Sequence, residues 1–308
     1  MKRKFLALIL TGSMVFACAA PVFAEESAEA ETEETVAEET ADVDETYLEM
    51  AEALQEAGVT LADIMNAGGI WSRDADESVR TYRFAVAAAL LGSGDAAFKL
   101  GEQFHSYSID QAYEVEDAVA EAMYWWEMAG ENGSPRGYAD IGLLYLHEAV
   151  PGGGDTFGDV EYDEDMAFYY FQLATDAGDS KGARYLAECY VNGTGVEPDE
   201  ETAYYYYSLG SERGDSTATV VCADWKLEGR GTEQDIDGAI AMYQEIVDNV
   251  EHDIVECAYK LGVIYEEGVY VDQDLEKAAE YYQIVLDNAE EGADYYAEAE
   301  AALERLAE

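Results

Sequence analysis

Cysteine, histidine and proline are scarce in this sequence, and their scarcity excludes several classes of protein. The 308 residues include four cysteines, three histidines and four prolines. If Cys18 is removed with an N-terminal leader, three cysteines remain, an odd number that excludes a dense disulfide framework. Those three, Cys189, Cys222 and Cys257, fall at or near small-residue positions of predicted helices. We therefore expect buried, free thiols that pack as small apolar side chains.

Basic residues are also few. The chain has 16 lysines and arginines against 68 aspartates and glutamates, which gives a formal net charge of −52. Electrostatic binding of nucleic acid is excluded, because phosphates demand lysine and arginine. An anionic lipid surface would repel the chain for the same reason. The partners that fit are basic proteins or peptides, cations, or surfaces met through local patches.

Long apolar runs are absent beyond the N-terminus, so no stretch outside it could span a membrane. Residues 1–4 carry three basic side chains, and residues 5–16 are mostly apolar but too short to span comfortably. Val22-Phe23-Ala24 then supplies small residues at the −3 and −1 positions of a cleavage site. We predict a signal peptide over residues 1–24, cleaved after Ala24, and a secreted or cell-envelope protein. The alternative is a lipoprotein, lipidated through Cys18.

The next two segments differ sharply in composition. Residues 25–46 contain eleven acidic residues, no basic residue and no aromatic residue. Such a segment cannot bury enough apolar surface to offset its ordering entropy, so it is predicted to be a disordered acidic tail. Residues 47–94 show short helical patterns separated by glycines. We expect an N-terminal helical cap or a degenerate repeat there.

A repeated helical pattern fills the chain from about residue 95 to residue 290. Each copy has an alanine followed three and four residues later by large side chains, a spacing that places them on one face of a helix. The alanines are Ala122, Ala167, Ala203, Ala239 and Ala278. Eleven residues after the first three alanines come Gly133, Gly178 and Gly214, which suit the left-handed residue that ends a helix. Ser134, Asp179 and Asp215 follow as predicted caps of the next helix.

Equivalent positions of the copies form columns, of which the repeat alanines are the first. A second column marks the first helix of each copy. Its order is an aliphatic residue, a small residue, two further residues and an aromatic residue. The copies are Leu100-Gly101 with Phe104, Ile141-Gly142 with Tyr145, Leu186-Ala187 with Tyr190, Val221-Cys222 with Trp225, and Leu261-Gly262 with Tyr265. Glycine inside a helix costs roughly 1 kcal/mol, so its recurrence predicts that another helix passes too close for a side chain.

The best-preserved copy adds a glycine turn, Tyr190-Val191-Asn192-Gly193-Thr194-Gly195-Val196. With Asp274 and Lys277-Ala278 in a later copy, these residues resemble the Sel-one-like repeat (SLR) family of tetratricopeptide-like solenoids. The resemblance covers about residues 95–290. It implies an all-α, right-handed α-solenoid of helix-turn-helix repeats. It also implies protein–protein interaction and scaffolding, often without catalysis. Residues 291–308 show a last helical pattern, in which Tyr296, Ala299, Leu303 and Leu306 can share a face, and we predict that they form a C-terminal capping helix.

Candidate chemistry is limited to one acidic insertion. Asp159, Glu161, Asp163 and Asp165 alternate, so their carboxylates could gather around calcium. An EF-hand loop starting at Asp159 would require glycine at position 164 and glutamate at 170, and neither is present. The alternative is that these acids precede a helix N-terminus, where negative charge is favourable. No catalytic triad, zinc motif or phosphate loop occurs, so we predict no cofactor and no enzymatic activity.

Tyrosine is abundant, with 24 copies. The column pattern assigns Tyr206 and Tyr207 to packing between repeats. Other tyrosines of the second helices then point elsewhere and are candidate partner-binding residues, with a solvated rim as the alternative. They are Tyr124, Tyr169, Tyr204 and Tyr205.

The function that these patterns predict is a secreted or cell-surface scaffold that binds a protein or peptide, with a basic partner favoured. Two alternatives stay open. One is a cell-envelope enzyme or enzyme regulator that uses acidic residues, and the other is a low-affinity calcium binder. The sequence leaves the oligomeric state open.

Overall fold

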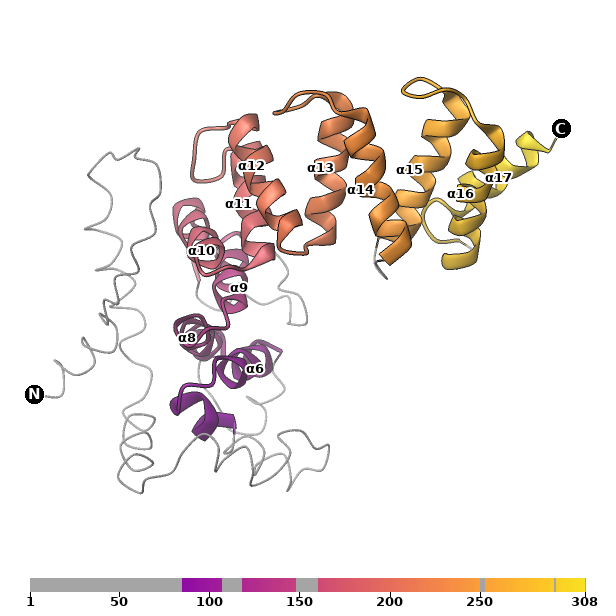
Figure 1. Cartoon of the computed structure of the whole chain (residues 1–308). Coiled ribbons are helices and arrows are strands. Elements are labelled where there is room, and N and C mark those ends of the chain that lie inside the picture. Colours follow the sequence, from indigo (N-terminus) through magenta and orange to yellow (C-terminus); the bar gives the residue numbers. More distant parts are fainter. Residues whose placement is uncertain (1–84, 107–117, 148–159, 250–252, 291, 308) are drawn as a thin grey trace, which may run out of the picture. The chain divides into compact units, whose positions relative to one another are not determined.

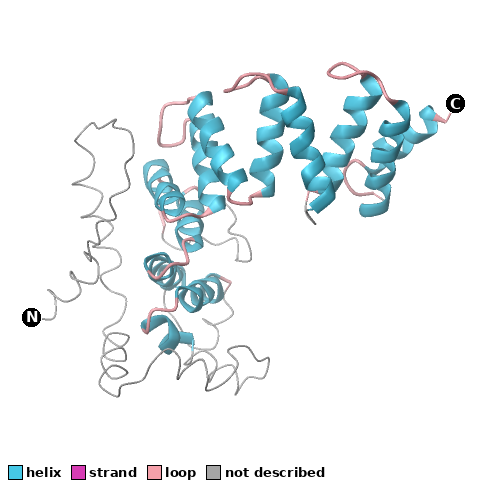
Figure 2. Cartoon of the chain, viewed as in Figure 1, coloured by secondary structure: helices cyan, strands magenta, loops and turns pink. Residues whose placement is uncertain are grey.

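A computed structural model describes residues 85–106, 118–147, 160–249, 253–290 and 292–307 (Figure 1). The predicted signal peptide (1–24), the acidic tail (25–46) and residues 47–84 of the predicted N-terminal cap lie outside these ranges. Within them, the regular structure is helical and includes no strand (Figure 2). No helix in this part of the chain is long and apolar enough to cross a membrane. The all-α class expected from the sequence is confirmed.

The helices pack mainly against their neighbours along the chain, which is the contact pattern of an α-solenoid. Residues 85–90 are helical. The helices that follow are α6 (Gly94–His105), α8 (Ala118–Glu131), α9 (Arg136–Tyr145), α10 (Glu164–Asp176), α11 (Ser180–Asn192), α12 (Glu200–Glu212), α13 (Ser216–Glu228), α14 (Ile236–Asn249), α15 (Ile254–Glu267), α16 (Leu275–Asn288) and α17 (Tyr296–Leu306). The pairs α6/α8, α9/α10, α11/α12, α13/α14 and α15/α16 form the repeats, and α17 packs against α16.

Glycine–aspartate pairs join one repeat directly to the next. Gly178 and Gly214 have φ values of +97° and +91°, the left-handed conformation that ends a helix. The carboxylate of Asp179 then accepts a hydrogen bond from the Gly182 N–H at 2.7 Å. Asp215 caps α13 in the same way, through the Ala218 N–H at 2.7 Å. Both predicted caps are confirmed, and the junction needs no linker.

The predicted Ser134 cap is wrong. The residue that precedes α9 is Pro135, and it makes no side-chain capping bond. The Ser134 hydroxyl instead donates to the Asp95 carboxylate at 3.3 Å, across to α6 of the preceding repeat. The serine therefore ties two repeats together rather than starting its own helix.

The small residues of the first helices lie under aromatic rings. A Cβ added to Gly101, Gly142 or Gly262 would come closer than 3.0 Å to a ring of the paired second helix. The rings belong to Trp126, Phe171 and Tyr282, each four residues after the repeat alanine. The expectation that another helix passes too close is corrected, since a side chain and not a helix backbone fills the space.

The aromatic residue of the first helix stacks on the side chain three residues after the repeat alanine. The ring centroids of Tyr190 and Tyr206 are 5.6 Å apart, with planes at 12°. Tyr145 with Tyr170 and Tyr265 with Tyr281 repeat this geometry at 5.8 Å. Tyr206 therefore packs inside its own repeat, which corrects the prediction of inter-repeat packing. Tyr207 does reach the next repeat, where it meets Trp225 edge-on at 5.5 Å.

The predicted column is out of register by one residue in α13. The Asp235 N–H donates to the Lys226 carbonyl, as the Asp199 N–H donates to Tyr190 and the Asp274 N–H to Tyr265. Lys226, not Trp225, thus occupies the aromatic position. Ala223 is then the small residue, and it is buried in one cluster with Tyr243. The aromatic side chain of Trp225 misled the alignment because it lies next to the true position.

The remaining core agrees with the sequence. Cys189, Cys222 and Cys257 are buried and free, as predicted. Burial raises the pKa of the Cys222 thiol to about 11 and that of Cys257 to about 12, so neither is a reactive thiolate at neutral pH. At the C-terminal end, Ala299 and Ala302 of α17 are buried in one cluster with residues of α15 and α16.

Replacing Gly262 by valine is expected to destabilise the protein by about 1–3 kcal/mol, because the new side chain collides with the Tyr282 ring. Ala241→Val, at an exposed position of α14, is the matched control and should cost at most about 0.7 kcal/mol. Urea unfolding followed by circular dichroism measures both. Equal losses in the two variants would show that the ring does not restrict Gly262.

A buried carboxylate predicts a dependence of stability on pH. Burial raises the pKa of Asp140 in α9 to about 8, with Lys181 lowering it and Glu102 raising it to smaller extents. Between pH ~4 and ~8 the folded chain therefore holds a proton that the unfolded chain has lost, and the free energy of unfolding falls as pH rises. Asp140→Asn should flatten this fall between pH 5 and 7.5 in urea unfolding. The exposed control Asp272→Asn should leave the wild-type slope, and an unchanged slope in Asp140→Asn would contradict the assignment.

Candidate partner-binding surface

The four candidate tyrosines lie on the second helices of three successive repeats. Tyr124 is on α8, Tyr169 on α10, and Tyr204 and Tyr205 on α12. Three of them share one position, two residues after the repeat alanine, and we call Tyr124, Tyr169 and Tyr205 the tyrosine ladder. Tyr204 differs, because it is half-buried against the core cluster of Ala203 and Tyr207.

Each ladder tyrosine meets the next residue of its own helix edge-on. The ring centroids are 5.1 Å apart for Tyr124 with Trp125, 5.4 Å for Tyr169 with Tyr170 and 5.1 Å for Tyr205 with Tyr206. Since the following residue belongs to the core, the core orients each ladder ring. Tyr205 is 60% exposed, and the other two ladder rings are half-buried. Each ladder ring is thus held on one side by a core residue, and the exposed fraction of the ring differs from one repeat to the next.

Carboxylates surround the ladder on α8. The Tyr170 hydroxyl donates to Glu127 Oε1 at 2.6 Å. Burial raises the pKa of Glu127 and of Glu131, and the Glu131 charge adds to the shift at Glu127. Burial raises the pKa of Tyr124 to about 12, with the charges of Glu121 and Glu131 adding to it. Rings beside carboxylates suit a cationic side chain, which each of them attracts.

The sequence-based prediction missed these glutamates. Tyr124, Glu127 and Glu131 are spaced by three and four residues, which is the spacing of neighbours on one helix face. That pattern was the available signal. It was hidden by the abundance of acids elsewhere, and only the packing of Tyr170 against Glu127 singles it out.

Nearly all basic side chains that the structure describes contact other groups of the same chain. Of ten lysines and arginines in the described residues, nine make a hydrogen bond, ion pair or ring contact: Lys99, Arg136, Arg184, Arg213, Lys226, Arg230, Lys260, Lys277 and Arg305. The tenth, Lys181, lies near enough to Asp140 to lower its pKa. The carboxylates left over therefore determine the charge that a partner meets.

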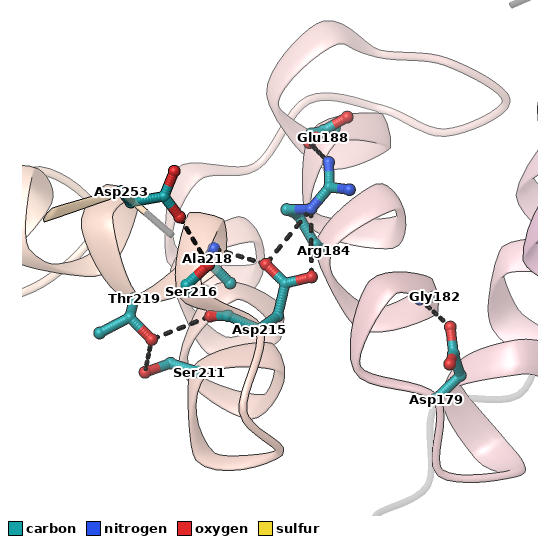
Figure 3. Close-up of polar contacts among 10 residues, drawn as sticks. All are labelled: Asp179, Gly182, Arg184, Glu188, Ser211, Asp215, Ser216, Ala218, Thr219 and Asp253. Atoms are coloured by element: carbon teal, nitrogen blue, oxygen red, sulfur yellow. Dashed lines mark hydrogen bonds and ion pairs between the residues drawn. The ribbon is translucent and has the colours of Figure 1, made fainter. Parts of the chain in front are cut away.

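The junction between α11 and α13 shows where these cations are used (Figure 3). Arg184 lies between Glu188 at 2.7 Å and Asp215 at 3.4 Å. The Ser216 hydroxyl beside it donates to Asp253 at 2.5 Å, which extends the polar contacts to the following repeat. Arg213 donates to the backbone oxygen of Thr175 at 2.7 Å, near the carbonyl end of α10. Such contacts hold repeats together and leave little positive charge for the surface.

The structure describes three of the four residues predicted to bind calcium. Glu161, Asp163 and Asp165 are exposed, and Asp159 lies outside the described residues. The Asp163 carboxylate caps α10 by accepting from the N–H groups of Asp165 and Met166, both at 3.0 Å. Within the described ranges, no group of three or more His, Cys, Asp or Glu is arranged to hold a metal ion. Asp163 thus serves a helix start, while the four-residue calcium site stays a prediction.

Several solved structures resemble this chain, including the following two. One is a protective antigen present in uropathogenic Escherichia coli strains that displays an SLR fold, with 23% sequence identity and a TM-score of 0.56; the match covers 74% of this chain and 44% of that one. The other is a Sel1 repeat protein from Oxalobacter formigenes, with 25% identity and a TM-score of 0.54, covering 68% and 79%. The chain thus spans less than half of the first of these relatives. No curated protein gave a match.

The family model of the Sel1 repeat matches the chain in five segments. They are residues 94–134, 152–179, 180–215, 221–248 and 255–284, which together make up more than half of the chain. Four of these segments each contain most of one helix pair described above, with the small residue of its first helix and the repeat alanine of its second. The segment 152–179 contains α10 with Ala167 but not α9. The chain therefore belongs to the Sel1 repeat family of α-solenoid proteins.

Proposed function

We propose that this protein is a secreted or cell-surface scaffold that binds a basic protein or peptide. Sel1 repeat proteins generally mediate protein–protein interaction. The observation that carries the choice of a basic partner is the use of nine of ten described cations inside the fold. A partner rich in lysine or arginine would replace the missing counter-charges, which favours association and speeds encounter.

The tyrosine ladder and the glutamates of α8 are the contact surface that we propose. Tyrosine gives a large contact area at a low entropy cost, and its ring face attracts arginine and lysine. The ladder rings are held by core residues, so binding would lose little side-chain entropy. Charge then supports the encounter, while the rings supply the short-range contacts.

The proposed location of the protein rests on the predicted signal peptide. The basic start, the short apolar run and the small residues before Glu25 support export with cleavage after Ala24. The cleaved chain would have 13 basic and 68 acidic side chains, a formal net charge of 13 − 68 = −55, and would face the envelope or the medium. Basic partners are met there without competition from nucleic acid.

Photo-crosslinking in the native cell tests the surface. A benzoyl-phenylalanine placed at Tyr205 should give a discrete crosslinked partner, and the same probe at Tyr162 is the control, since Tyr162 is also exposed but lies outside the ladder.

Affinity of the purified pair should fall at least about tenfold between 50 and 500 mM salt, because screening weakens exposed charge pairs. Tyr205→Ala should weaken binding by about tenfold at either salt. Retention that does not change with salt, or turnover of peptidoglycan that depends on an acid pair, would contradict the proposal.

Intact-mass measurement of the exported protein tests where the signal peptide is cleaved. The expected mass is that of a chain starting at Glu25, and Cys18→Ser should not change it. A mass that includes lipid on Cys18, abolished in the serine variant, would establish the lipoprotein alternative.

A further inference from the structure

The turn that ends the first helix is altered in the last repeat. Gly193, Gly229 and Gly268 occupy equivalent places, each left-handed and each donating its N–H to the carbonyl four residues earlier. Two residues further on, the first two turns have Gly195 and Gly231, with φ values of +65° and +61°. The third turn has tyrosine at that place.

The second glycine allows a close approach between repeats. A Cβ on Gly195 would come within 2.6 Å of the Glu164 carbonyl oxygen, and one on Gly231 would come closer still to that of Glu200. Both carbonyls belong to the first residue of the second helix in the preceding repeat. These two turns therefore lie directly against α10 and α12. Tyr270 has a Cβ and is not among the described residues with positive φ, so the last turn cannot repeat this contact.

A cavity of about 210 Å³ lies beside the altered turn, lined by residues of α13, α14, α15 and the turn itself. It is larger than the ~150 Å³ apolar cavity that accepts benzene in another protein. Leu227, Val263 and Ile264 supply apolar walls. At the rim, Val269 is 71% exposed and Tyr270 36% exposed, so two large apolar side chains lie open next to an apolar hollow.

Three polar residues of the cavity wall, Asp224, Tyr243 and Lys260, bond to one another. Lys260 Nζ contacts both carboxylate oxygens of Asp224, at 2.7 and 2.8 Å, and also Glu256 at 3.3 Å. The Tyr243 hydroxyl donates to the same Asp224 carboxylate. A ligand group that passes the edge of the cavity therefore meets no unpaired charge at Asp224 or Lys260, and an apolar group fits best. Glu267, exposed at the edge, is the lining carboxylate left to attract a cation.

We propose that this cavity accepts one leucine-sized or aromatic side chain of the basic partner, with a neighbouring lysine or arginine of that partner meeting Glu267. The inference rests on the proposed function, because the charge of the partner comes from it. The cavity adds what charge alone cannot supply, a position for one specific side chain. A polyanionic surface attracts any basic segment, whereas an apolar hollow discriminates among them.

Methyl-labelled protein tests this with defined peptides. The probes are N-acetyl-Lys-Leu-Lys-amide, its serine counterpart Lys-Ser-Lys, and Glu-Leu-Glu. Lys-Leu-Lys should shift the methyl signals of Leu227, Val263 and Ile264, with an affinity at least about tenfold higher than that of either comparison peptide.

Two variants act on the cavity by different routes. Tyr270→Gly restores the regular turn, and Val263→Phe fills the space; each should weaken Lys-Leu-Lys binding at least about tenfold. Tyr162→Gly makes the same type of change at an exposed tyrosine elsewhere and should leave binding unchanged.

The outcomes separate the two proposals. Lys-Leu-Lys binding with shifts elsewhere, or equal to that of Lys-Ser-Lys, would overturn the cavity but leave a basic partner in place. Equal binding of Glu-Leu-Glu would overturn both proposals. Cavity shifts that depend on protein concentration alone, and vanish in Tyr270→Gly, would identify a second copy as the occupant and overturn the inference. An absence of any peptide binding at millimolar concentration would overturn it as well.

Discussion

The contact between an aromatic ring and a small residue is the constraint on which the repeats depend. The ring four residues after the repeat alanine lies over glycine in three of the described repeats, where even a Cβ would collide with it. This contact fixes the separation of the paired helices. At that separation the first-helix tyrosine can stack on the ring one residue earlier in the second helix, as Tyr190 does on Tyr206. Edge contacts such as that between Tyr207 and Trp225 then carry the packing into the next repeat.

Charge is arranged by the same architecture. Most of the described cations are used where repeats meet or where one helix pairs with the next, as Arg184 with Asp215 and Lys260 with Asp224 show. Lys99 pairs with Glu102 inside α6. Partly exposed pairs such as Lys260 with Asp224 contribute little stability each, whereas Arg184 with Asp215 is largely buried. Pairs of both kinds determine which charges are cancelled. Because the cations are used internally, the surface is left with carboxylates. The surface of the described residues is thus even more acidic than the composition alone indicates.

Departures from the repeat are the places where function is most readily added. A position that follows the column is committed to packing, as Tyr206, Ala187 and Ala223 are. The ladder tyrosines lie one residue before the column position that packs in the core, so their side chains are not committed to packing. The last turn departs further, since Tyr270 replaces a glycine that elsewhere allows repeat-to-repeat contact, and a cavity lies beside it. In a solenoid, a local substitution of this kind alters one junction and leaves the others intact.

The sequence by itself determined the helical class, the repeats, the glycine–aspartate junctions and the buried thiols, because each depends on local spacing and on residue type. It also indicated the candidate tyrosines, although Tyr204 is half-buried in the core and the glutamates beside Tyr124 were missed. Only the tertiary structure decided what lies over the small residues, which residue of α13 takes the aromatic position, and that Ser134 bonds to Asp95. Those features depend on which side chains from distant parts of the chain meet. Periodicity gives the face on which a residue lies, but it does not give its partner on the facing helix.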